Sequence, residues 1–147
     1  MKKMILALGL IVTLGISSAF TAEPKVSPKT LEAFKNEFAA AKEVSWAVSS
    51  NYYRAAFTIN DQKIFAFYSM DGELLNMGRY ISSLQLPLNL FTRLKNAYSE
   101  YWISDLFEMS NKEGTHYYVT LENADTSIML KSLIGGEWET YKKKTKI

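Results

Sequence analysis

The side chains that could carry out acid–base or metal chemistry are few in this chain. His116 is the only histidine, and there is no cysteine. A thiol nucleophile and a cysteine-based metal site are therefore excluded, and a histidine triad or a histidine metal site lacks recognisable partners. Because His116 precedes the apolar alternation Tyr117, Val119 and Leu121, we expect its side chain to point away from the core, at the surface.

Two carboxylates, Asp71 and Glu73, flank Gly72. Such a pair could bind Ca²⁺ or act as a general acid and base. Asp71-Gly72 is also the strongest hairpin signal in the chain, because glycine accepts a positive φ and aspartate favours turns. We interpret the pair as turn residues.

No other motif predicts catalysis. The serines form no G-x-S-x-G sequence, and Gly135-Gly136 lacks the spacing of a phosphate-binding loop and the helix after it. We therefore predict that the protein is not an enzyme, with no catalytic residues, no metal site and no cofactor.

An aromatic set is more informative than these polar groups. Five residues fall, by strand alternation, on the sheet face that a helix would not cover: Tyr52, Arg54, Phe65, Phe67 and Tyr118. Aromatic and arginine side chains exposed on a sheet are typical anchors for a protein partner. Alternatively, two sheets pack on each other, or a partner subunit packs on this face, and the same residues are buried. Both interpretations stay open at this point.

Two helices are expected to cover the opposite face. Ser27-Pro28 is a helix start, since it combines a capping oxygen with a preset φ. The apolar positions that follow repeat at i, i+3, i+7 and i+10 and predict a helix over residues 28–41; they are Leu31, Phe34, Phe38 and Ala41. After Leu86-Pro87 the same spacing recurs and indicates a second helix; its stripe is Phe91, Leu94, Tyr98 and Tyr101.

Alternating apolar residues predict the strands. Three runs carry their apolar residues on one face: Val44, Trp46 and Val48; Tyr53, Ala55, Phe57 and Ile59; Ile64, Ala66, Tyr68 and Met70. A two-residue turn at Asn60-Asp61 would place Ile59 opposite Gln62 and Phe57 opposite Ile64. Further strands are predicted at residues 73–80, 103–110, 116–123, 127–134 and 137–143.

The chain also contains an approximate internal repeat. Adding 64 to the positions from Tyr53 onward superimposes two similar blocks without a gap, with Tyr53 on Tyr117 and Asp61 on Asp125. The resulting prediction is an α+β fold of two tandem units, each one helix packed on a four-stranded antiparallel meander sheet. The repeats would span about 27–82 and 87–147 and pack as a single mature body of residues 23–147.

The N-terminus has the pattern of a secretory signal peptide. Lys2 and Lys3 precede an uncharged apolar run, Met4–Ile16, and small residues with possible cleavage points after Ala19 or Ala22. A retained membrane anchor is the alternative, but a bilayer needs about 20 apolar residues. We predict that residues 1–22 are cleaved and that the protein is periplasmic or secreted, with no membrane span afterwards.

Charge argues against a nucleic-acid partner. The formal net charge is +2, which is the charge of Lys2 and Lys3, so removal of residues 1–22 leaves a nearly neutral chain. A neutral chain has no general electrostatic attraction for nucleic acid. The basic run Lys142–Lys144 with Lys146 is interpreted as a solvated end.

Several short motifs resemble those of one known family; they are Val44-Ser45-Trp46, Tyr53-Arg54-Ala55-Ala56-Phe57, Phe67-Tyr68-Ser69-Met70-Asp71-Gly72-Glu73-Leu74 and Leu86-Pro87. Together they resemble the PepSY-like family of small secreted Bacteroidota proteins, grouped as beta-lactamase-inhibitor-like. The resemblance covers the mature chain and implies tandem helix-plus-sheet units, a periplasmic location and a binding function. Ile103-Ser104-Asp105 stands where the first unit has Val44-Ser45-Trp46, so the two units are not expected to bind alike.

The sequence thus favours a secreted, periplasmic, non-catalytic binding protein, inhibitor-like, that grips an unidentified protein partner of the cell envelope through an open sheet face. One alternative is small-ligand binding in a cleft between the units, lined by Trp46, Tyr68 or Trp102. Another is a purely structural envelope component.

Overall fold

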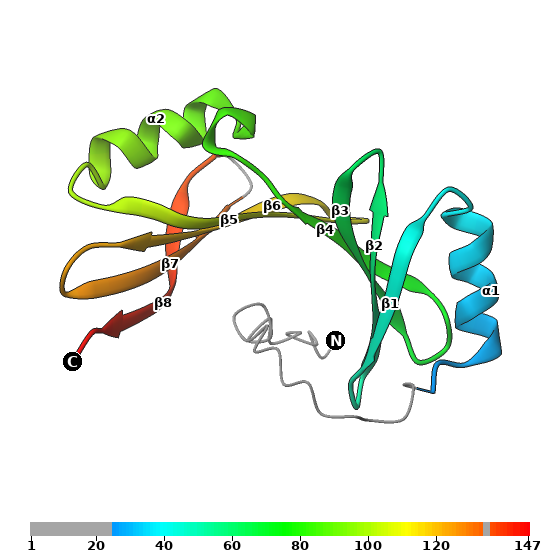
Figure 1. The fold of residues 1–147 in the computed structure, drawn as a ribbon. Coiled ribbons are helices and arrows are strands. Elements are labelled where there is room, and N and C mark those ends of the chain that lie inside the picture. The colour runs from blue at the N-terminus through cyan, green and yellow to red at the C-terminus, as the bar shows by residue number, and fades with distance from the viewer. Residues whose placement is uncertain (1–24, 134–135) are drawn as a thin grey trace.

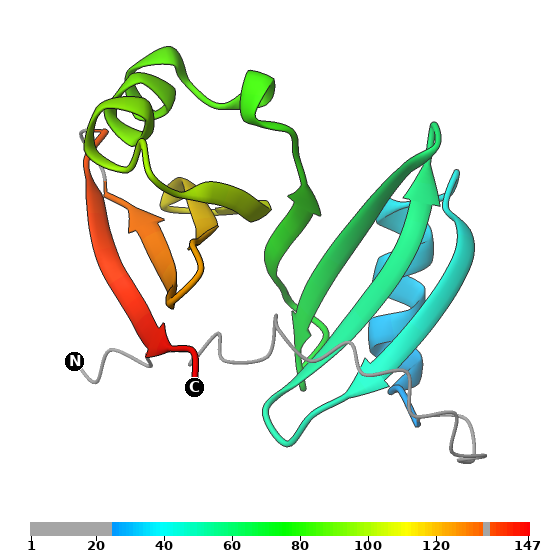
Figure 2. The ribbon, with the colours of Figure 1, turned by 60° about the vertical axis from the view of Figure 1, so that its left-hand side comes forward.

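The computed structural model describes residues 25–133 and 136–147. The predicted signal peptide, residues 1–22, and Gly135 lie outside these ranges. The described chain consists mainly of sheet, with two α-helices and one short 3₁₀ turn (Figures 1 and 2). The elements, in chain order, are α1 (Pro28–Glu37), β1 (Lys42–Val48), β2 (Tyr52–Ile59), β3 (Gln62–Ser69), β4 (Leu74–Tyr80), η1 (Ser83–Gln85), α2 (Leu88–Ala97), β5 (Trp102–Asn111), β6 (Gly114–Glu122), β7 (Thr126–Ser132) and β8 (Trp138–Thr145).

The predicted fold class is wrong, because the strands do not form two separate four-stranded sheets. All eight lie in one antiparallel sheet, in the order β1 to β8. The decisive pairing joins β4 to β5, from Met77 opposite Ser110 to Tyr80 opposite Phe107. Two isolated sheets would each leave the backbone groups of an additional edge strand unpaired. Apolar periodicity predicts which way side chains point, but not which strand pairs across a connection that contains a helix.

Both helices pack on the same face of this sheet, which curves away from them (Figure 1). Between α1 and strands β2 and β3 lies a cluster whose buried members are Phe34 of the helix and Tyr53, Ala55, Phe57, Ala66 and Tyr68 of the strands. Beneath α2 lies a second cluster whose buried members are Leu86, Leu94, Leu106, Val119, Leu121, Ile128 and Leu130. We call this side the helix face and the opposite side the helix-free face.

Helix α1 begins as predicted but is shorter. The Ser27 hydroxyl accepts a hydrogen bond from the Thr30 backbone amide at 3.2 Å, and Pro28 occupies the first turn. The helix ends at Glu37 rather than 41, because Phe38 leaves the helical region with φ −124° and ψ 54°. Its buried residues are Thr30 and Phe34, whereas Leu31 is exposed. The predicted apolar stripe was therefore misplaced by one position at its start.

Helix α2 starts directly after Pro87, where the sequence predicted a new helix. It buries Leu90 and Leu94 against the sheet. A long-range hydrogen bond fixes it further, since the indole Nε1 of Trp138 in β8 donates to the backbone oxygen of Leu90 at 3.0 Å. Strand β8 therefore helps to hold helix α2 against the sheet.

The first predicted hairpin is confirmed. Ile59 lies opposite Gln62 and Phe57 opposite Ile64. Asn60 and Asp61 both have positive φ, 49° and 61°, which is the conformation of a two-residue hairpin turn that matches the twist of the strands.

The Asp71-Gly72 turn is also present, in the connection between Ser69 at the end of β3 and Leu74 at the start of β4. Gly72 has φ +83°, and its amide donates to the Ser69 backbone oxygen at 3.0 Å. Met70 lies in this loop and is exposed, so its predicted place on the core side is wrong. Strand β3 ends one residue earlier, and the alternation ends with it.

A third cluster lies on the helix-free face and crosses the middle of the sheet. Its buried members are Tyr52, Ala56, Phe65, Phe67, Phe107 and Met109. The ring of Phe107, from β5, lies 5.9 Å from that of Phe65, in β3, and 5.0 Å from that of Tyr80. Gly78 makes this approach possible, because a Cβ at this position would overlap the ring of Phe107.

We expect the substitution Gly78→Ala to lower the free energy of unfolding by about 1–3 kcal/mol, the usual cost of overpacking. The added methyl group must displace Phe107 from strand β4. Urea denaturation followed by circular dichroism measures the change. Combining Gly78→Ala with Phe107→Leu should cost less than the two single changes added together, since the smaller side chain relieves the overlap. An unchanged midpoint for Gly78→Ala alone would contradict this account.

Candidate functional site: the helix-free face of the sheet

All five residues predicted to bind a partner lie on the helix-free face. Arg54 is opposite Phe67 in the β2–β3 pairing, and Tyr118 is opposite Phe107 in the β5–β6 pairing. Tyr52 and Phe65 belong to the same cluster. The alternation in the sequence therefore placed these side chains on the correct face.

Three of the five are core residues of this face. Phe65, Phe67 and Tyr52 are only 4%, 6% and 9% exposed. The burial does not come from two sheets stacked on each other. It comes from one curved sheet, in which the Phe65 ring meets that of Tyr80 edge to face and lies tilted against that of Phe107 across strand β4. Whether a partner also contacts these rings stays a prediction.

Arg54 lies in β2, next to the edge strand β1. Its guanidinium carbon is 5.8 Å from the centre of the Phe65 ring, a cation–π geometry. Its Nε is buried without a hydrogen-bond partner, and among the described residues no carboxylate lies within salt-bridge distance of it. Arg54 therefore carries a cation that the fold itself does not neutralise.

Tyr80 and Asp105 complete the polar groups near Arg54. Burial raises the pKa of Tyr80, the charge of Asp105 raises it further, and Arg54 opposes both effects. Burial also raises the pKa of the Asp105 carboxyl, although a hydrogen bond from the backbone of Leu106 partly offsets it. A half-buried carboxylate and an unpaired guanidinium thus lie around one tyrosine.

The other half of the face is more accessible and carries both aromatic and basic side chains. Tyr118 is half-buried, and its ring meets that of Tyr141 edge to face at 5.6 Å. The ammonium of Lys131 lies 5.8 Å from the centre of the Tyr118 ring. Tyr141 is 39% exposed. Burial, followed by the neighbouring Tyr141, raises the pKa of Tyr118.

The polar residues considered for chemistry are held in other arrangements. His116 is half-buried rather than fully at the surface, and its Nδ1 lies 3.3 Å from the backbone oxygen of Ser132. Glu73 forms an exposed ion pair with Lys112 at 2.7 Å, and this hydrogen bond lowers the pKa of Glu73. Asp71 is exposed in its turn. Within residues 25–133 and 136–147 no three ligating side chains converge on a metal position.

The residues proposed to line a ligand cleft are not brought together. Trp46 borders a groove of about 810 Å³ between the start of α1 and β1. Trp102 borders a separate groove of about 320 Å³ between α2 and β5. Tyr68 is fully buried beneath α1, and its hydroxyl has no hydrogen-bond partner. Burial raises the pKa of this tyrosine.

Several residues of the helix-free face were not found from the sequence, namely Tyr80, Asp105, Phe107, Lys131 and Tyr141. The signal was present in part, because Phe107 and Tyr80 alternate within runs that were identified as strands. Their meeting depends on the β4–β5 pairing, which the sequence did not indicate. Tyr141 escapes simple alternation because the β7–β8 register shifts between Met129 and Leu130.

Comparison with solved structures shows where this fold occurs. The chain is similar to a candidate periplasmic protein from Bacteroides eggerthii (13% identity, 83% of this chain and 90% of that one, TM-score 0.73). It is also similar to a BLIP-like protein from Bacteroides fragilis (19%, 84% and 89%, TM-score 0.69) and to a DUF2874 family protein from Bacteroides uniformis (14%, 82% and 90%, TM-score 0.72). No protein-family profile and no curated protein matches the sequence.

At these identities the likeness is one of fold. It confirms the beta-lactamase-inhibitor-like part of the resemblance at that level, whereas none of these structures carries the name PepSY-like. Among the described residues, no helix combines the length and the apolar character needed to cross a membrane.

The raised pKa of Asp105 predicts a pH-dependent stability difference. The folded state holds the proton more tightly than the unfolded state, whose carboxyl titrates near its ordinary value of 3.8. Stability contributed by this group therefore falls as the pH rises from that value through the higher folded pKa. Asp105→Asn should raise the melting temperature relative to wild type at pH 7 and lose this advantage near pH 3.

Paired thermal melts of wild type and Asp105→Asn across this pH range isolate the effect, because all other carboxylates are common to both proteins. Glu73→Gln is a control whose pH dependence should have the opposite sign, since the pKa of Glu73 is lowered whereas that of Asp105 is raised. A constant difference between wild type and Asp105→Asn at every pH would contradict the assignment.

Proposed function

We propose that this protein is a secreted, periplasmic, non-catalytic binding protein that grips a protein partner of the cell envelope through its helix-free face and acts in an inhibitor-like manner. The observation that carries the proposal is the composition of that concave face. It combines an unpaired arginine with tyrosines that are only partly buried, and these residue types dominate the binding energy of protein interfaces.

The curvature of the sheet supports a protein as the occupant. Both helices lie on the outer side, so the inner side is open along strands β2 to β8 (Figures 1 and 2). Phe65, Phe67 and Tyr52 form a buried floor in one half of the face, with Arg54 beside it. Tyr118 and Tyr141 offer ring edges in the other half. A preformed floor lowers the ordering cost of association.

The non-catalytic part of the proposal rests on how the reactive groups are held. His116 faces a backbone carbonyl, and Glu73 faces Lys112. Neither arrangement pairs a nucleophile with a base.

The location rests on the N-terminal pattern and on the fold. Lys2, Lys3 and the apolar run after them have the form of a secretory signal. A candidate periplasmic protein of Bacteroides shares the fold, and so does a BLIP-like protein. Both observations favour an envelope partner.

A small-ligand function is the second candidate, and one groove favours it. The groove between α1 and β1 has a volume of about 810 Å³ and is lined by Trp46, Tyr53 and Leu31 among others. This volume suits a small molecule. A thermal-shift screen against envelope metabolites tests it, with Leu31→Glu as the variant that should abolish any shift.

The protein-binding proposal is tested by capture from native periplasmic extract. Immobilised wild type should retain one protein after a salt wash, and Tyr118→Ala/Tyr141→Ala should reduce its retention at least about tenfold, the effect of about 1.4 kcal/mol. Leu88→Ala, an exposed position on α2, is the matched control and should retain the same protein.

Equal retention by wild type and the double tyrosine variant would remove the helix-free face as the binding surface. Retention of nothing by wild type at micromolar concentration would refute the binding function. Melting temperatures of all variants must stay near that of wild type, because the tyrosines are only partly buried.

A further inference from the structure

Strand β8 is an outer strand of the sheet. It pairs with β7 along one side, from Thr126 opposite Thr145 to Ser132 opposite Trp138. Within the described chain, no strand pairs with its other side. That side therefore presents a row of backbone donors and acceptors, which is the template for adding a further strand.

Three consecutive lysines occupy this edge, Lys142, Lys143 and Lys144, and all are exposed. The basic run is solvent-exposed, as the sequence suggested, and Lys142–Lys144 also form part of the sheet. Among the described residues, none of the three lies within 4.0 Å of a carboxylate, whereas Lys112 and Lys146 are both paired. The edge therefore carries adjacent positive charges that the fold leaves unneutralised.

The pairing register places these charges on both faces of the strand. Lys142 is opposite Met129 and Lys144 is opposite Ser127, on the helix-free face. Lys143 is opposite Ile128, a member of the cluster beneath α2. A strand added along β8 would meet a lysine at each of three successive positions.

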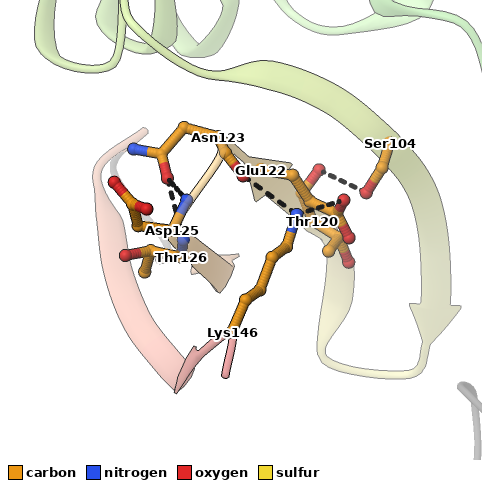
Figure 3. A network of polar contacts seen from close by, with 7 residues as sticks. All are labelled: Ser104, Thr120, Glu122, Asn123, Asp125, Thr126 and Lys146. Atoms are coloured by element: carbon orange, nitrogen blue, oxygen red, sulfur yellow. Dashed lines mark hydrogen bonds and ion pairs between the residues drawn. The ribbon is translucent and has the colours of Figure 1, made fainter.

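A polar network holds the C-terminal end of this edge (Figure 3). The ammonium of Lys146 donates to Glu122 Oε2 at 3.1 Å and to the Asn123 backbone oxygen at 2.9 Å. Its backbone amide donates to the Asp125 backbone oxygen at 2.8 Å. The Asn123 side chain in turn accepts from the amides of Asp125 and Thr126. The edge is thereby ordered before any partner arrives.

We propose that the free edge of β8 binds an extended acidic segment of another protein by strand addition, with carboxylates of that segment facing Lys142, Lys143 and Lys144. Backbone hydrogen bonds supply a sequence-independent part of the affinity, and the lysines select the charge of the segment. This interaction is separate from binding by the helix-free face and does not depend on it.

Charge complementarity selects the acidic segment over a second copy of this chain. Two β8 edges paired with each other would set lysines against lysines, and like charges directly opposite each other destabilise a strand pair. Lysines on an edge strand are a known protection against self-association. The same side chains that exclude a second copy attract a segment of opposite charge.

The test uses a synthetic octapeptide in which glutamate alternates with valine, blocked at both ends. Titrated into the ¹⁵N-labelled protein, it should shift the amide signals of residues 138–145 first. Lys142→Gln/Lys144→Gln should raise its dissociation constant at least tenfold. Lys29→Gln/Lys35→Gln, which removes the same charge from exposed positions on α1, should leave the constant unchanged.

Two further peptides separate strand addition from simple charge attraction. A version with alternate backbone amides methylated keeps every carboxylate but cannot complete the hydrogen bonds, and it should bind at least tenfold more weakly. A version with lysine in place of glutamate should not bind. Equal binding of the methylated peptide, shifts centred away from β8, or no binding at millimolar concentration would each overturn the proposal.

Discussion

The contact of Phe107 with Phe65 and Tyr80 across strand β4 is the interaction on which the rest of the structure depends. The two helix-side clusters, under α1 and α2, do not share a buried residue. The helix-free cluster contains residues of β2, β3 and β5 and so joins the two halves of the sheet on either side of β4. This contact requires glycine at position 78, because any side chain there would occupy the space of the Phe107 ring. One missing methyl group thus permits a continuous curved sheet.

This contact also decides which side chains a partner can reach. The aromatic side chains of the helix-free face form two groups: some are buried, and others are more accessible. Phe65 and Phe67 are buried within this face of the sheet, whereas Tyr118 and Tyr141 keep ring edges accessible. Arg54 stays charged and unpaired above the floor. Buried and accessible aromatic residues are therefore neighbours on one face, and the exposed fraction of each side chain distinguishes them.

The region around Tyr80 on the helix-free face and the edge strand β8 differ in their electrostatics. Around Tyr80 the groups are half-buried, and burial raises the pKa values of Tyr80 and Asp105. Along β8 the lysines are exposed and solvated, and no carboxylate of the described residues pairs with Lys142, Lys143 or Lys144. The C-terminal network fixes the end of β8 to the β6–β7 turn through the hydrogen bonds of Lys146.

The sequence by itself determined the local features, because turn chemistry and alternation are properties of neighbouring residues. It predicted the Asn60-Asp61 hairpin with its register, the Pro87 helix start and the face on which Phe65 and Arg54 lie. It did not predict the β4–β5 pairing, since that contact depends on how Gly78 and Phe107 fit together across the sheet. Burial of the aromatic floor follows from that pairing, because Phe107 meets Phe65 only across β4, so only the tertiary structure decided which rings of this face stay accessible.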